Sequence, residues 1–134
     1  MAVMATWDDV RDAVAALPET FEEPERSWRV GSRKPLVWDR PLRAVDHRAL
    51  GSSAPDGPIL GARVPDLDAK EELLARLPDV YFVTPHFDGY PAVLARLDAM
   101  DTDELQDLVV EAWLTQAPKR VAKAWLDSHP DGPS

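Results

Sequence analysis

Residues 101–113 read DTDELQDLVVEAW, and this stretch decides the fold class. Asp101 followed by Glu104 is typical of a capping box, in which two side chains satisfy free N–H groups at the beginning of a helix. Apolar side chains then recur at the spacing of one helical face, at Leu105, Leu108, Val109, Ala112 and Trp113. Such a face has to be buried, so we expect this helix to pack on a β-sheet with Trp113 at the centre of the core.

Three more helices are predicted from capping residues and prolines. Capping boxes that start at Thr6 and Asp68 begin two of them, and Pro18 and Pro78 stop these two helices. Pro118 interrupts the C-terminal helical region, and we expect it to serve as the first residue of a separate short helix.

The segments between the helices predict strands. Apolar residues alternate or run continuously at 28–30, 36–38, 59–64, 80–84 and 92–97. The turn pair Asp88-Gly89 predicts that the last two strands form an antiparallel hairpin. Residues 42–45 are expected to continue the sheet as an edge segment, whereas 19–26 and 46–58 predict loops. This order of elements predicts an α+β fold with a single, mainly antiparallel sheet covered by helices.

The composition is that of one ordinary soluble domain. The 134 residues are 45% hydrophobic and 29% charged, which predicts a single core over about residues 6–126 and a polar C-terminal tail at 127–134. No apolar run approaches the ~18 residues of a membrane span, and the first residues lack the pattern of a signal peptide. We therefore expect neither membrane insertion nor secretion. The lack of cysteine excludes disulfides, thiolate metal sites and cysteine nucleophiles, and fits a cytoplasmic location.

Charge is segregated along the chain. The formal net charge is −9, but residues 26–48 hold seven basic and two acidic residues and carry +5, which leaves −14 for the remainder. The basic residues are Arg26, Arg29, Arg33, Lys34, Arg40, Arg43 and Arg48. They could form a local basic face that attracts an anionic partner, or they could neutralise the acidic helices around them. Arg29, Arg33 and Arg40 are expected at the surface, because their positions alternate with core-facing ones.

A set of short motifs in a fixed order resembles the MmcQ/YjbR family from about Thr6 to Trp125. The motifs are Leu17-Pro18, Trp28–Gly31, Thr84–Phe87, Ala92–Leu97, Glu111–Trp113 and Ala117–Arg120. The resemblance implies an α+β fold of the frataxin (CyaY-like) type in a small bacterial cytoplasmic protein. It also implies DNA binding through a proposed double-wing arrangement, and it implies no catalytic residues.

No motif in the sequence specifies catalysis or metal binding. His86 and Asp88 have the spacing of a metal-binding or acid–base pair, but a metal site needs three or four converging ligands. Ser52-Ser53 lacks the glycines of a nucleophile elbow, and residues 51–57 lack the Lys-Ser/Thr that completes a phosphate-binding loop. We therefore expect no catalytic residue, no metal, no cofactor and a non-enzymatic protein.

Three classes of function fit these observations. In the first, which we favour, the protein binds DNA weakly and without sequence preference through phosphate contacts. The residues assigned to this role are Arg29, Arg33, Lys34, Arg40, Arg43, Lys119 and Arg120. In the second, a small anionic ligand binds in a pocket near Thr84, His86 and Tyr90. In the third, the protein is an interaction adaptor with an exposed apolar patch.

Overall fold

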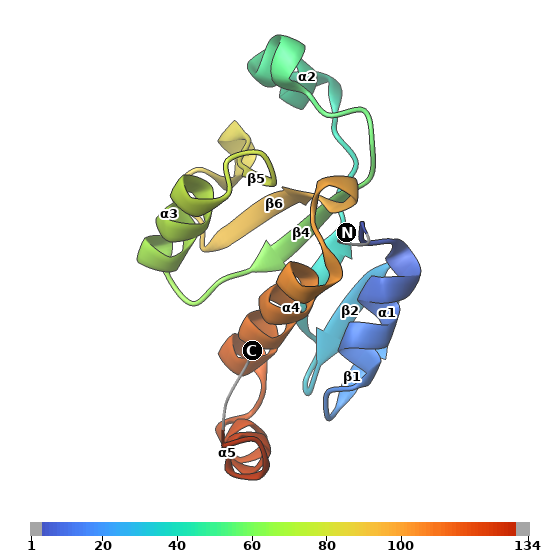
Figure 1. The fold of residues 1–134 in the computed structure, drawn as a ribbon, viewed down its shortest axis with the longest axis vertical. Helices are drawn as coiled ribbons and strands as arrows, with labels where there is room; N and C mark the ends of the chain where they lie inside the picture. Colours follow the sequence, from blue (N-terminus) through green and yellow to red (C-terminus); the bar gives the residue numbers. More distant parts are fainter. Residues whose placement is uncertain (1–3, 131–134) are drawn as a thin grey trace.

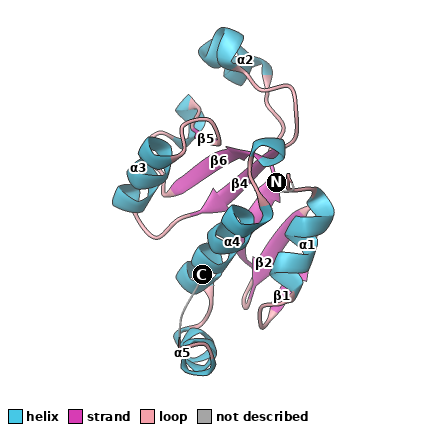
Figure 2. Cartoon of the chain, viewed as in Figure 1, coloured by secondary structure: helices cyan, strands magenta, loops and turns pink. Residues whose placement is uncertain are grey.

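The computed structural model describes residues 4–130 and contains a six-stranded antiparallel sheet with helices packed against it (Figure 1, Figure 2). The strands are β1 (Thr20–Glu22), β2 (Ser27–Val30), β3 (Lys34–Asp39), β4 (Ile59–Arg63), β5 (Tyr81–Phe82) and β6 (Ala92–Arg96). They lie in the order β1-β2-β3-β4-β6-β5, and all neighbours are antiparallel. The helices are α1 (Trp7–Ala15), α2 (Ala44–Leu50), α3 (Leu67–Arg76), α4 (Thr102–Gln116) and α5 (Lys119–Ser128). The predicted α+β class with one antiparallel sheet is confirmed.

Helices α1 and α4 pack together over one face of the sheet and enclose the main core (Figure 1). All five apolar positions predicted for the buried face of α4 are buried, and Trp113 is completely inaccessible to solvent. They join strand residues such as Val37, Leu60 and Val93 in one cluster. The indole N–H of Trp113 donates a hydrogen bond to the Pro18 carbonyl oxygen at 3.0 Å, which satisfies its single polar atom. Trp113 therefore joins α4 to the segment that leaves α1.

A smaller apolar cluster covers the opposite face of the sheet. Ile59 from β4, Leu94 from β6 and Phe87 belong to it, and the indole ring of Trp38 packs against it. Trp38 lies opposite Gly61 in the β3–β4 register, and a Cβ atom at position 61 would overlap the indole ring. Glycine is thus needed at this position, because it lets the ring approach the backbone of β4.

Two segments fold differently from the sequence-based expectation. Residues 20–22, expected in a loop, form β1, because they pair with β2 and place Phe21 opposite Arg29. Residues 44–50, expected as sheet edge and loop, form α2. The carboxylate of Asp46 accepts a hydrogen bond from the Arg43 N–H at 2.9 Å, and this bond satisfies one of the free N–H groups at the beginning of the helix.

Other boundaries agree more closely with the expectation. The β5–β6 hairpin is confirmed, although β5 is short. Helix α3 is capped by Asp66, whose carboxylate accepts the Ala69 N–H at 2.8 Å, and not by Asp68, which lies in the first turn. Pro118 precedes α5 as its N-cap residue, and α5 continues into the predicted tail. The last tail residues, 131–134, lie outside the described residues. Within residues 4–130, no helix combines the length and hydropathy needed to cross a membrane.

A bidentate ion pair ties α1 to the edge strand β1. Arg11 donates to the Glu22 carboxylate from Nε at 2.7 Å and from Nη2 at 3.0 Å. The backbone N–H of Arg26 donates to the same carboxylate at 2.8 Å. The hydrogen bonds from Arg11, followed by the one from Arg26, outweigh desolvation and lower the pKa of Glu22 to about 2.

Replacing Trp113 with alanine should lower the free energy of unfolding by about 3–5 kcal/mol, because it leaves a large cavity between α4 and the sheet. Denaturant unfolding measures the loss. Leu126→Ala, which truncates an exposed α5 side chain, is the control and should change stability by at most about 0.5 kcal/mol. A loss below about 1 kcal/mol for Trp113→Ala would contradict the central role of this side chain.

Glu22→Gln should lower stability at neutral pH and flatten its acid dependence. The folded-state pKa of Glu22 is about 2 against an ordinary value of 4.5, so its stabilising effect is complete above pH 4.5 and is lost as the pH falls toward 2. Urea unfolding over this pH range should show the wild-type and Glu22→Gln stabilities converging at the acid end. Glu25→Gln, an exposed carboxylate nearby, should follow the wild type. A Glu22→Gln deficit that does not change with pH would show that the ion pair is not its cause.

Candidate functional site

The turn between β2 and β3 touches the beginning of α5. A Cβ atom added at Gly31 would lie 3.4 Å from the ring of Pro118, and the side-chain amide of Gln116 donates to the Pro35 carbonyl oxygen at 3.0 Å. Gly31 has a φ of +58°, a conformation that suits glycine in a tight turn. These contacts hold the β2–β3 hairpin and α5, the two segments that carry these basic residues, at one end of the molecule (Figure 1).

We call this group of side chains the hairpin–α5 cluster. Its members are Arg29, Arg33, Lys34, Lys119 and Arg120. The guanidinium group of Arg29 donates to the carbonyl oxygens of Glu23 and Arg33, at 3.0 and 3.1 Å. Arg33 forms an exposed ion pair with Glu23 at 2.8 Å. Within residues 4–130, it is the only member that a carboxylate neutralises.

Arg40 does not lie at the surface, and this corrects the sequence-based expectation. Its side chain is only 8% exposed and pairs at 3.1 Å with Asp46, which is 1% exposed. Burial opposes the charge on Asp46, but the Arg43 N–H and the Arg40 guanidinium outweigh it and keep the pKa of Asp46 below its usual value. The Arg40 guanidinium also lies 5.4 Å from the centre of the Phe87 ring. Arg40 is therefore held inside the protein and cannot contact an external phosphate.

Arg43 is exposed but does not join the hairpin–α5 cluster. It is the N-cap residue of α2, and α2 lies at the opposite end of the molecule from α5 (Figure 1). The predicted basic face is therefore divided, with five of the seven assigned residues at one end, one buried and one remote.

The residues assigned to an anionic ligand pocket differ widely in exposure. Thr84 is 2% exposed and its hydroxyl group has no hydrogen-bond partner among the described residues, whereas His86 is exposed at the surface. Tyr90 is 46% exposed, and its hydroxyl oxygen accepts a hydrogen bond from Arg63 at 2.5 Å. Because one side chain points inward and two are at the surface, this arrangement does not favour a shared pocket.

Lys70 is a buried charged residue that sequence reasoning missed. It lies on α3, is 6% exposed, and its ammonium group donates to the carbonyl oxygens of Phe87 at 2.5 Å and Tyr90 at 2.7 Å. Burial lowers its pKa. A lysine on an amphipathic helix is normally expected on the solvent-facing side. The local sequence pattern therefore gives no sign that the Lys70 side chain is buried. In the structure it holds the loop before β6 against α3.

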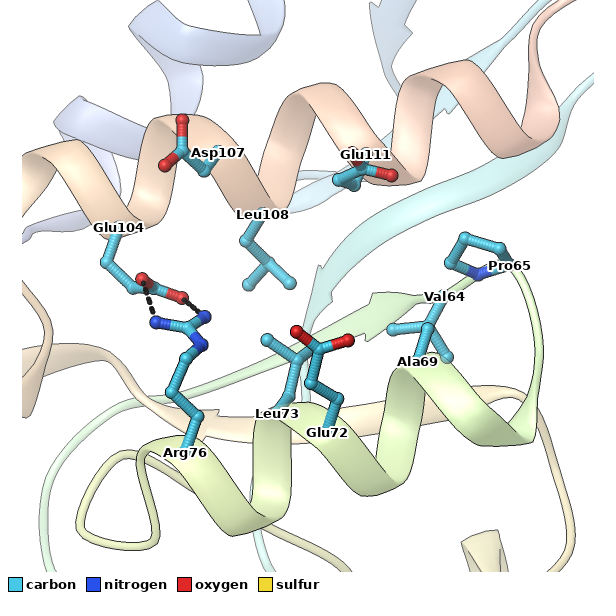
Figure 3. A pocket seen from close by; sticks show the side chains of 10 residues that line it. All are labelled: Val64, Pro65, Ala69, Glu72, Leu73, Arg76, Glu104, Asp107, Leu108 and Glu111. Atoms are coloured by element: carbon cyan, nitrogen blue, oxygen red, sulfur yellow. Dashed lines mark hydrogen bonds and ion pairs between the residues drawn. The ribbon is translucent and has the colours of Figure 1, made fainter. Parts of the chain in front are cut away.

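A groove of about 320 Å³ runs between α3 and α4, and we call it the α3–α4 groove (Figure 3). Apolar and acidic side chains both line it, and its ten lining residues are Val64, Pro65, Ala69, Glu72, Leu73, Arg76, Glu104, Asp107, Leu108 and Glu111. Arg76 donates to both carboxylate oxygens of Glu104, at 3.2 and 3.0 Å. With four carboxylates and one guanidinium group, the groove carries three net negative charges. In the part of the chain that the structure describes, no three His, Asp or Glu side chains converge to hold a metal ion.

The chain belongs to the same family as proteins from two mycobacteria. It is 54% identical over 126 residues to the uncharacterised protein Rv2570 of Mycobacterium tuberculosis, a match that covers 92% of this chain and 97% of the relative. The uncharacterised protein Mb2600 of Mycobacterium bovis matches to the same extent. No family model matches the chain.

The fold has a counterpart among solved structures. The crystal structure of Deinococcus radiodurans protein DR2400, with a DUF419 domain, superposes with a TM-score of 0.58 over 83% of this chain and 78% of that chain. The two sequences are 20% identical. At this identity the similarity supports the fold and carries no information on function.

Arg40→Ser should destabilise the protein by about 3–5 kcal/mol, because it leaves the Asp46 carboxylate buried without its cation. The exposed Arg48→Ser within α2 is the matched control and should change the free energy of unfolding by about 0.5 kcal/mol or less. Thermal or denaturant unfolding distinguishes the two variants. Equal stabilities would mean that solvent reaches Asp46 and that the ion pair does not hold α2.

Proposed function

We propose that the protein binds nucleic acid weakly and without sequence preference, through phosphate contacts made by the hairpin–α5 cluster. The observation that carries this proposal is the contact between the Gly31 turn and Pro118. Two basic segments far apart in the sequence share one end of the molecule because of it. Arginine and lysine side chains on such a surface can contact a phosphate backbone, but they have no evident arrangement for reading bases.

The beginning of α5 adds to the attraction for phosphate. Its N-cap residue, Pro118, forms no side-chain hydrogen bond to the first turn. The free N–H groups of that turn and the positive end of the helix dipole favour an anion. Lys119 and Arg120 belong to the same turn, so their charges add to the attraction of the helix end for phosphate.

The acidic remainder of the protein limits the affinity. At a net charge of −9, the protein as a whole repels a polyanion. Screening at physiological salt reduces the reach of the cluster to about 8 Å. We therefore expect a dissociation constant weaker than ~10⁻⁶ M, the tighter end of nonspecific binding.

We infer further that the chain is a member of the MmcQ/YjbR family and acts in the cytoplasm. Two of the motifs that carry the resemblance, Trp28–Gly31 and Ala117–Arg120, lie on the two sides of the contact between the hairpin and α5. The α+β fold agrees with the fold that the resemblance implies. The cysteine-free composition favours the cytoplasm.

Lys34→Ser combined with Arg120→Ser should weaken binding to both duplex and single-stranded DNA and leave the fold intact, because both side chains are exposed. Each lost phosphate contact should reduce the slope of log K against log salt by about 0.7 to 0.9. Fluorescence anisotropy of labelled DNA, titrated at several low salt concentrations, measures both effects.

Arg43→Ser combined with Arg48→Ser is the control. It removes the same charge from exposed positions on α2 and should leave the salt slope unchanged. Failure of the wild type to bind either DNA at low salt would overturn the proposal. The same loss of affinity in both double variants would also overturn it, because net charge and not the hairpin–α5 cluster would then govern binding.

A further inference from the structure

The α3–α4 groove has an apolar floor between an acidic wall on α4 and a wall on α3 that holds Glu72 and Arg76. Leu73 on α3 and Leu108 on α4 extend toward each other between the two helices (Figure 3). Glu72 reaches up from α3 (Figure 3), while Asp107 and Glu111 lie one turn apart along α4. A ligand in this groove would therefore contact methyl groups beneath it and carboxylates on both sides.

One carboxylate of the groove is already neutralised within the protein. Glu104 accepts two hydrogen bonds from Arg76, and the hydroxyl group of Tyr81 donates to it as well. Tyr81 is buried, so this network fixes Glu104 as part of the wall. The Arg76–Glu104 pair also closes one end of the groove (Figure 3).

The other three carboxylates have no such partner. Among the described residues, no lysine or arginine forms an ion pair with Glu72, Asp107 or Glu111. Burial, followed by the negative charges of Glu104 and Asp103, raises the pKa of Asp107. A cation beside Asp107 therefore relieves the repulsion from Glu104 and Asp103.

The shape of the groove decides which kind of cation fits. Because its carboxylates do not converge on one point, a compact metal ion cannot contact them together. We propose that the α3–α4 groove binds a linear aliphatic polyamine. Its ammonium groups pair with carboxylates on both walls, and the methylene segments between them lie on Leu73 and Leu108. A lysine-rich peptide carries the same ammonium groups, but it also brings backbone amides that an apolar floor cannot satisfy.

Calorimetric titration of the full chain with spermidine at low salt tests the proposal. We expect binding of one spermidine per chain, tighter than binding of hexaamminecobalt(III), a compact cation that is also trivalent but has no methylene groups. Glu72→Gln combined with Glu111→Gln removes one carboxylate from each wall and should weaken spermidine binding by about fivefold, the size expected for the loss of two exposed charge pairs. Circular dichroism checks that this variant is folded.

Glu25→Gln combined with Glu71→Gln is the matched control, because it removes the same charge at exposed positions outside the groove. It should keep the wild-type affinity for spermidine. Equal loss in the two double variants, or equal affinity for spermidine and hexaamminecobalt(III), would overturn the proposal in favour of general charge screening. Tighter binding of pentalysine, displaced by spermidine, would assign the groove to a basic peptide instead. The proposal stands apart from nucleic-acid binding, since Lys34→Ser with Arg120→Ser leaves the groove untouched.

Discussion

The packing of α4 over the centre of the sheet is the constraint on which the other features depend. Its apolar face, with Trp113 wholly buried, sets the distance and direction of the helix relative to β3 and β4. One flank of the same helix then supplies a wall of the α3–α4 groove. Its C-terminal end brings Gln116 against β3 and Pro118 against the β2–β3 turn. The groove and the hairpin–α5 cluster are therefore two consequences of one packed interface.

The charged residues of the chain fall into two groups: some form ion pairs that support the fold, and others lie on separate surfaces of opposite charge. Some arginines support the fold: Arg40 neutralises a buried carboxylate, and Arg11 connects α1 to β1. Others gather where the hairpin meets α5, while unpaired carboxylates line the groove between α3 and α4. A protein whose net charge is strongly negative can thus present a cationic end and an anionic groove on separate surfaces.

The sequence could predict those elements of the fold that are encoded locally, by the spacing of apolar residues, by a helix-capping residue or by a turn pair. The apolar positions of α4 and the turn pair before β6 are such signals, and the structure confirms both elements. The parts that it could not predict arise from contacts between distant segments. Strand β1 exists because β2 pairs with it, and Lys70 is buried because the loop before β6 folds over it. The groove needs side chains from two helices at once, so neither helix alone reveals it. Arg40 follows the alternation of a strand, yet its partner Asp46 comes from α2, which sequence did not predict.

The contact between Trp38 and Gly61 makes the residue allowed at each position depend on the residue at the other. The indole ring occupies the space that any side chain at position 61 would need. A larger residue at 61 is compatible only with a smaller one at 38, so substitutions at the two positions are energetically non-additive. Among relatives that keep this sheet, the pair is expected to covary, with an aromatic residue at one position accompanied by glycine at the other. The glycine therefore marks, in the sequence alone, the place where an aromatic ring covers the backbone of β4.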